Sequence, residues 1–310
     1  MVPDRRNFLK QTALIGSALC LPSLPSFSAA AATTQVAAGF QLLIMATSWG
    51  FHGSVDQFCG EAKKAGYDGI EVWWPAEKAA QDELFAALAK HQLQVGYLCG
   101  GSDSDYSKHA AQFKGALEAA VQSKQKPLYI NCHSGRDYFT FDQNAALIDF
   151  TTGLSKKSGI PIYHETHRSR MLFAAHIARQ FIAAKPDLRL TLDISHWCNV
   201  HETLLHDQPE AVASALERTS HIHARIGHQE GPQVNDPRAP EWESAVNAHF
   251  DWWDQVVKRH QAAGKPLTIL TEFGPVDYLP ALPYTRQPVA NQWEINVYMM
   301  NQLKQRYSKK

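Results

Sequence analysis

The sequence has no excess of charge of either sign. It contains 30 basic and 30 acidic residues among 310, so its formal net charge at pH 7 is zero. Proteins that bind nucleic acid through its phosphates usually carry a surplus of lysine and arginine. No block of like charges marks a disordered tail either. We therefore expect a partner that is neither a polyanion nor a nucleic acid.

Motifs of redox and nucleotide chemistry are also missing. None of the five cysteines stands in a Cys-x-x-Cys pair, and no glycine-rich phosphate-binding fingerprint follows an expected strand. The first absence disfavours a thioredoxin-like site, and the second disfavours a nucleotide-binding fold. We expect the cysteines at 59, 99, 132 and 198 to be free thiols buried in the core.

Residues 1–32 have the order of a signal peptide. Arg5 and Arg6, followed by Phe8-Leu9-Lys10, resemble the twin-arginine export motif, and an apolar run and then small residues come next. The apolar run is too short to anchor the protein permanently in a bilayer. We predict export by the twin-arginine machinery and a periplasmic or secreted mature protein without a membrane span. The alternative is a short amphipathic N-terminal helix.

The rest of the chain alternates between apolar strand patterns and amphipathic helix patterns. The expected strands are 40–46, 69–73, 93–98, 128–132, 160–165, 188–193, 220–224 and 267–272. The expected helices include 54–64, 108–123, 142–158, 171–184, 209–218, 241–263 and 289–307. Eight strand–helix units in this length predict a single (β/α)8 TIM barrel over residues 38–307.

Four of these strands end on a potential metal ligand. The ligands are Glu165, Asp193, His223 and Glu272. The carboxyl ends of the strands of such a barrel meet at one rim, so these side chains should lie close together. Three carboxylates would repel one another unless a cation neutralised them. The set predicts one divalent ion, with Mn²⁺ preferred and Mg²⁺, Co²⁺, Zn²⁺ or Fe²⁺ as alternatives.

The order of these motifs resembles the xylose isomerase-like TIM barrels, of the ketose 3-epimerase and hydroxypyruvate isomerase type. The resemblance rests on Glu165, Asp193-x-x-His196, His221-x-His223 and Glu272. It implies that Glu165, Asp193, His223 and Glu272 bind the metal and that His196 contacts the substrate. The chain departs from the ketose 3-epimerases at Gln229, where they place a substrate-binding arginine.

The implied activity is a sugar isomerase or epimerase acting on a keto sugar. Glu165 and Glu272 would remove and return the proton α to the carbonyl through a metal-stabilised enediolate. We add His133, Arg168 and Arg225 to His196 as candidate substrate-binding residues. His164 and His167 are expected to be structural.

Other interpretations remain open. The same site in a carbon-oxygen lyase would eliminate the aglycone of a 3-keto-glycoside. An apurinic-site endonuclease would need a histidine-rich site with several zinc ions, whereas only four ligands are clear here. A non-catalytic sugar-binding protein would not need two glutamates at one metal. Singly, Asp193 could be a helix cap and Glu272 a partner of a core arginine. The aromatic segments 249–253 and 293–298 could serve a homo-oligomer or the core.

Overall fold

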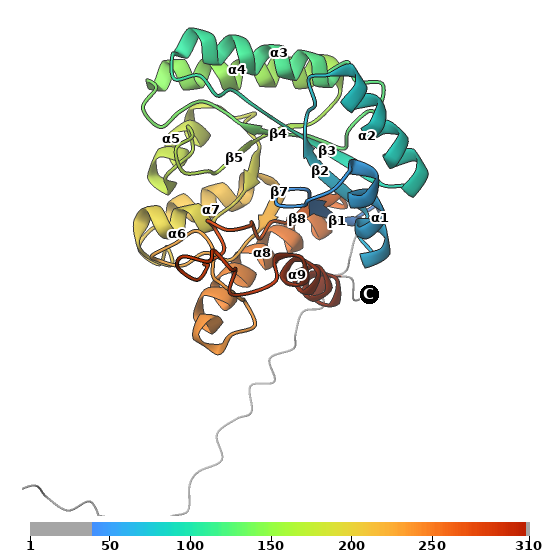
Figure 1. Cartoon of the computed structure of the whole chain (residues 1–310). Coiled ribbons are helices and arrows are strands. Elements are labelled where there is room, and N and C mark those ends of the chain that lie inside the picture. The colour runs from blue at the N-terminus through green and yellow to red at the C-terminus, as the bar shows by residue number, and fades with distance from the viewer. Residues whose placement is uncertain (1–38, 308–310) are drawn as a thin grey trace, which may run out of the picture. The chain divides into compact units, whose positions relative to one another are not determined.

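The computed structural model describes residues 39–307, which form a closed barrel of eight parallel strands (Figure 1). Each strand pairs with its neighbour in sequence, and β8 closes the barrel on β1. The predicted (β/α)8 fold is therefore confirmed. The strands are β1 (Leu42–Thr47), β2 (Gly69–Trp73), β3 (Gln94–Gly100), β4 (Ile130–His133), β5 (Ile162–Glu165), β6 (Leu190–Leu192), β7 (Thr219–Ala224) and β8 (Leu267–Thr271). The predicted signal peptide, residues 1–32, lies outside the described residues.

Helices cover the outside of the barrel (Figure 1). They are α1 (Val55–Ala65), α2 (Lys78–His91), α3 (Tyr106–Val121), α4 (Phe141–Ser158), α5 (Ala175–Ala184), α6 (Ser195–His201), α7 (Pro209–Arg218), α8 (Glu243–Ala263) and α9 (Gln292–Tyr307). Their ends follow local sequence. Ser54 and Gln57 form a reciprocal capping box before α1, and Gly66 ends that helix at a φ of 100°, where glycine carries no steric penalty.

Two helices begin later than their patterns predict. α5 was expected from residue 171, but the Met171 amide donates to the Ser134 carbonyl and the Leu172 carbonyl accepts from the Trp197 indole. α9 was expected from residue 289, but the Val289 amide donates to the Pro280 carbonyl. The Leu172 carbonyl is the group that a helix from residue 171 would need, and its bond to Trp197 competes with that helix. The two amides are of the kind that the first turn of a helix leaves free. The short helix α6, directly after Asp193, was not predicted.

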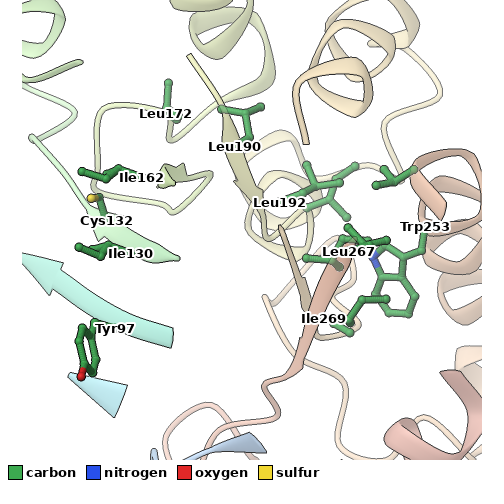
Figure 2. Close-up of a cluster of buried hydrophobic side chains, with 14 of the residues drawn as sticks. Tyr97, Ile130, Cys132, Ile162, Leu172, Leu190, Leu192, Trp253, Leu267 and Ile269 are labelled. Carbon is green, nitrogen blue, oxygen red and sulfur yellow. The ribbon is translucent and has the colours of Figure 1, made fainter. Parts of the chain in front are cut away.

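Side chains alternate between the two faces of each strand. Apolar residues such as Ile130, Leu190 and Ile269 belong to the buried cluster shown in Figure 2, together with Trp253 from α8. Burying an aliphatic or aromatic side chain of this size contributes about 1.5–3 kcal/mol. Trp253 is completely buried, so core packing accounts for it without an oligomer interface. The alternate positions on these strands carry the polar residues of the site.

Two predictions concern the remainder of the described chain. Cys59, Cys99, Cys132 and Cys198 are free and buried, as expected. Among the described helices, none combines the length and apolar character that crossing a membrane requires.

Candidate active site

Glu165, Asp193, His223 and Glu272 come together at one end of the barrel. Glu165 ends β5, Asp193 follows β6, His223 lies in β7 and Glu272 follows β8. One potential ligand atom from each lies within 4.8 Å of the others. All four side chains are buried, and Glu272 is the most exposed at 8%. The barrel therefore assembles the four predicted ligands from four strands.

Three buried atoms of this group lack a hydrogen-bond partner among the described residues. They are Glu165 Oε1, His223 Nδ1 and Glu272 Oε2. His223 Nδ1 lies 2.9 Å from Glu272 Oε2 and 3.7 Å from Glu165 Oε2. Buried polar atoms are nearly always satisfied, so this close group calls for positive charge between its members, either a proton on His223 or a cation. The donor set of two glutamates, one aspartate and one imidazole fits a divalent ion.

Asp193 is held by its neighbours on both carboxylate oxygens. Its Oδ1 accepts from the Ser195 amide at 3.1 Å, and its Oδ2 pairs with the guanidinium of Arg225. Burial raises the pKa of Asp193 to about 7, although the Arg225 charge opposes this shift. The N-cap of α6 is Ile194, without a side-chain cap, so the capping role considered for Asp193 is not found. Its contacts with Ser195 and Arg225 hold the carboxylate in place beside the other candidate ligands.

Charge in the group is tightly coupled. Burial alone would lower the pKa of His223, but the carboxylates of Glu272, Glu165 and Glu71 outweigh it and raise the pKa well above its usual range. Burial alone would raise the pKa of Glu165, yet His133 and His223 hold it well below its usual range. The pocket therefore favours one positive charge between the glutamates, which is what a divalent ion would supply in place of a proton.

Histidines form one side of the site. His133 Nε2 lies 2.9 Å from Glu165 Oε2. Its ring centre is 4.7 Å from that of His167, which lies 3.9 Å from that of His196. His133, Glu165 and His167 form a second group whose atoms could hold an ion. His167 thus belongs to the site and is not only structural, in contrast to our expectation. His164 does play the expected structural role, between the hydroxyls of Ser134 and Thr151.

A cavity of about 380 Å³ opens beside these residues. Glu272, His133, His167 and Arg225 line it, and Trp49, Trp73 and Tyr278 form aromatic walls. Trp73 is 54% exposed and Trp49 is 38% exposed. A cavity of this size, with aromatic walls and a few convergent polar groups, suits a small molecule.

Two arginines contact the same aromatic ring. Arg168 stands 4.9 Å and Arg225 4.7 Å from the ring centre of Tyr278. Arg168 also donates to Asn199 at 3.3 Å. Arg225 is buried, contacts His196 Nε2 at 2.8 Å and is paired with Asp193. Both predicted arginines are therefore near the site, and Arg225 holds protein ligands in place.

Sequence reasoning missed Glu71 and the role of His221. Glu71 lies in β2 and faces the site from across the barrel, with its Oε1 at 3.2 Å from His223 Nε2. Its Oε2 lies 3.3 Å from His221 Nε2. Burial alone would raise the pKa of Glu71, but His223 and His221 outweigh it and lower the pKa strongly. The available signal was a charged residue in the middle of an otherwise apolar strand, because such a charge needs a buried partner.

Comparisons with known proteins agree with the fold. A family model described as xylose isomerase-like TIM barrel matches residues 59–265. No curated protein matches the chain. Similar solved structures include 3-keto-D-glucoside 4-epimerase from E. coli, at 14% identity and a TM-score of 0.58 over 86% of this chain and all of that one.

Two further solved structures resemble this barrel. An AP endonuclease of family 2 from Brucella melitensis shows 12% identity and a TM-score of 0.57, with coverage of 84% of this chain and 98% of that one. A xylose isomerase domain containing protein from Salmonella typhimurium shows 13% identity and a TM-score of 0.56, with coverage of 87% and 97%. At such identities the likeness establishes the fold alone.

Proposed function

Because this chain belongs to the xylose isomerase-like TIM barrel family, we propose that it is a divalent-metal-dependent isomerase or epimerase of a keto sugar. The observation that carries the proposal is the convergence of three unpaired buried atoms, Glu165 Oε1, His223 Nδ1 and Glu272 Oε2, beside a cavity with aromatic walls. Asp193 completes the ligand set. Mn²⁺ is the preferred ion, since oxygen ligands with one imidazole suit it.

The two glutamates are the proton-transfer groups of the proposal. Both flank His223 Nδ1, and they come from different strands, so they can reach opposite faces of a sugar held between them. One removes the proton next to the carbonyl and the other returns it. His133, His196 and Arg168 orient the hydroxyl groups, and Arg225 keeps Asp193 in place. When bound, the ion supplies positive charge that favours the enediolate form of the sugar.

A lyase that acts on 3-keto-glycosides is the second candidate. The exposed rings of Trp73 and Trp49 at the cavity favour it, because they offer apolar surface for an aglycone beyond the ring that is being enolised. Both reactions begin with the same proton abstraction. The product separates them: a rearranged sugar or a released aglycone.

The endonuclease interpretation has gained one supporting feature. Sequence reasoning counted only four clear ligands, whereas His133, Glu165 and His167 form a further group that could hold an ion. The absence of a basic excess still opposes a polyanionic substrate. An assay on DNA with an abasic site therefore belongs in the test, and we expect the strand to stay intact.

The decisive experiment follows deuterium uptake in heavy water. The protein is loaded with Mn²⁺ and incubated with free ketoses and 3-keto-glycosides, and mass spectrometry of the carbohydrate follows after chelation of the ion. We expect metal-dependent uptake at the carbon next to the carbonyl. Glu165→Gln and Glu272→Gln should each lower the rate roughly 100-fold or more, while Glu118→Gln on the exposed face of α3 should not. Bound ion with no uptake from any sugar would refute the proposal and favour a binding protein.

Export is part of the proposed function. The twin-arginine pattern at residues 1–32 supports a periplasmic or secreted enzyme. A substrate in that compartment would be an unphosphorylated sugar or glycoside. The cavity wall agrees with this choice, because aromatic rings stack on the apolar faces of such molecules.

A further inference from the structure

Glu71 is a buried carboxylate that the proposed reaction does not use. It lies in the middle of β2, and its side chain is 3% exposed. Its burial and its contacts with two histidines of β7 place it inside the barrel. Its two oxygens face two imidazoles from β7, His223 at 3.2 Å and His221 at 3.3 Å. A buried charge with two such partners indicates a role in holding them.

His223 presents its two ring nitrogens to different neighbours. Nδ1 faces Glu272 and Glu165, where the ion is proposed to bind, and Nε2 faces Glu71. A neutral imidazole binds a cation only through the nitrogen that carries no hydrogen. The ring can therefore act as a ligand through Nδ1 only if its hydrogen is on Nε2.

We propose that Glu71 is a positioning residue, which holds the hydrogen of His223 on Nε2 and so presents the Nδ1 lone pair to the ion. The inference rests on the proposed metal site. It assigns to Glu71 the part of a carboxylate behind a histidine ligand, which fixes the orientation of the ring and raises its basicity.

Asn131 competes with Glu71 for the same nitrogen. Its Nδ2 also lies 3.2 Å from His223 Nε2, and as a donor it would favour the opposite tautomer, with the hydrogen on Nδ1. The carboxylate wins this competition because a hydrogen bond to an ionised group is about twice as strong as one between neutral groups. The Asn131 amide keeps its other hydrogen bond, to Glu165 Oε2 at 2.7 Å.

The surroundings of Glu71 keep it rigid. His221 is held from its other side, since its Nδ1 lies 2.7 Å from Thr268 Oγ1. The Tyr129 ring packs 4.2 Å from the His221 ring and fills the barrel interior. A Cβ at Gly96 would come within 2.4 Å of that tyrosine, so glycine makes the packing possible. The packing of His221 and Tyr129 therefore restricts movement of the Glu71 side chain.

The test uses substitutions that separate charge from volume. Glu71→Met keeps the volume without an acceptor, and Glu71→Gln keeps the shape without the charge. Removing the partner behind a metal ligand typically weakens metal binding about 10–100-fold. We expect Glu71→Met to raise the Kd for Mn²⁺ by that factor and Glu71→Gln by less. Thr191→Val, at a buried hydroxyl without a hydrogen-bond partner among the described residues, is the matched control with wild-type affinity.

If Glu71 only stabilised the fold, its substitution would leave the tautomer of His223 unchanged. The tautomer is therefore the measurement that tests the positioning role. At a pH high enough to leave the ring neutral, ¹⁵N NMR of the metal-free protein should show His223 with its hydrogen on Nε2 in the wild type and shifted toward Nδ1 in Glu71→Met. Stability is a separate measurement, because exchanging a buried charge for an apolar group is often neutral or stabilising. A change in stability with the tautomer and the Kd unchanged would refute the inference.

Two other outcomes are distinguishable. If the wild type binds no divalent ion, the proposed function fails, whereas the NMR result still tests whether Glu71 controls the tautomer. If crystals soaked in Mn²⁺ show an ion between Glu71, His221 and His223, then Glu71 is itself a ligand and the positioning role is wrong.

Discussion

His223 Nδ1 and Glu272 Oε2 lie 2.9 Å apart, and both lack a hydrogen-bond partner among the described residues. β7 and β8 are adjacent strands, and their pairing fixes this approach. A buried contact of this kind destabilises the folded state unless a proton or a cation lies between the two atoms. The predictions below begin from this pair.

Metal binding should stabilise the folded protein. A ligand that binds only the native state adds about 2.7 kcal/mol to the free energy of unfolding at 100 times its Kd. We expect Mn²⁺ to raise the Tm of the wild type but not that of His223→Asn. His206→Asn, at an exposed histidine, is the control and should keep the effect. An equal rise in Tm for His223→Asn in calorimetry would place the ion elsewhere.

Substitution of Trp73 should affect the substrate and spare the fold. The ring is 54% exposed and lines the cavity, so Trp73→Ala removes a stacking surface and little core. We expect a higher KM, with stability within about 0.5 kcal/mol of the wild type. Trp253→Ala should instead destabilise the protein by about 3–5 kcal/mol, because that ring is completely buried. Steady-state kinetics and urea unfolding separate the two effects, and an unchanged KM would exclude Trp73 from substrate binding.

Acid should destabilise the protein through His164. Burial lowers the pKa of His164 from 6.5 to about 3. Between these values the unfolded chain binds a proton and the folded chain does not, so stability falls as the pH drops below 6.5. Within this window, each unit by which the pH falls lowers the free energy of unfolding by up to about 1.4 kcal/mol. Urea unfolding at several pH values should show the loss, and His164→Asn should flatten the slope. A slope unchanged in that variant would assign the acid sensitivity to other groups.

The four described cysteines should not react in the native state. Burial raises the pKa of Cys99 and of Cys198 to about 12 and that of Cys59 to about 11, and it raises the pKa of Cys132 well above its usual range. The thiolate is the reactive form, so a thiol reagent at pH 8 should modify them only after unfolding. Mass spectrometry of the treated mature protein, before and after urea, measures this. Rapid modification of the native protein would mean that one of these sites opens easily.

Export should depend on the arginine pair. Replacing Arg5 and Arg6 by lysines keeps the charge but changes the motif that the twin-arginine machinery reads. We expect the precursor to accumulate in the cytoplasm, as fractionation and immunoblotting would show. A variant with Lys63 and Lys64 changed to arginine, on α1 of the barrel, is the control. Normal export of the double-lysine variant would exclude this route.

Several elements followed from local sequence. The capping box before α1, the strand at 69–73 and the helix at 209–218 were predicted with their observed bounds or nearly so. The starts of α5 and α9 were not. For α5, the Leu172 carbonyl accepts from the Trp197 indole in place of a helical amide. His167 was expected to be structural, yet it lines the cavity and its ring lies 4.7 Å from that of His133.

The sequence by itself determined the barrel and the four candidate ligands, since both depend on local periodicity and on the residue at each strand end. Tertiary structure alone decided which residues lie behind the candidate ligands. Glu71 and His223 are far apart in the chain and meet only because β2 and β7 face each other across the closed barrel. No local pattern encodes such a contact. The same closure decided that Arg225 pairs with Asp193, since the partner of a buried charge depends on which charges share its low-dielectric surroundings.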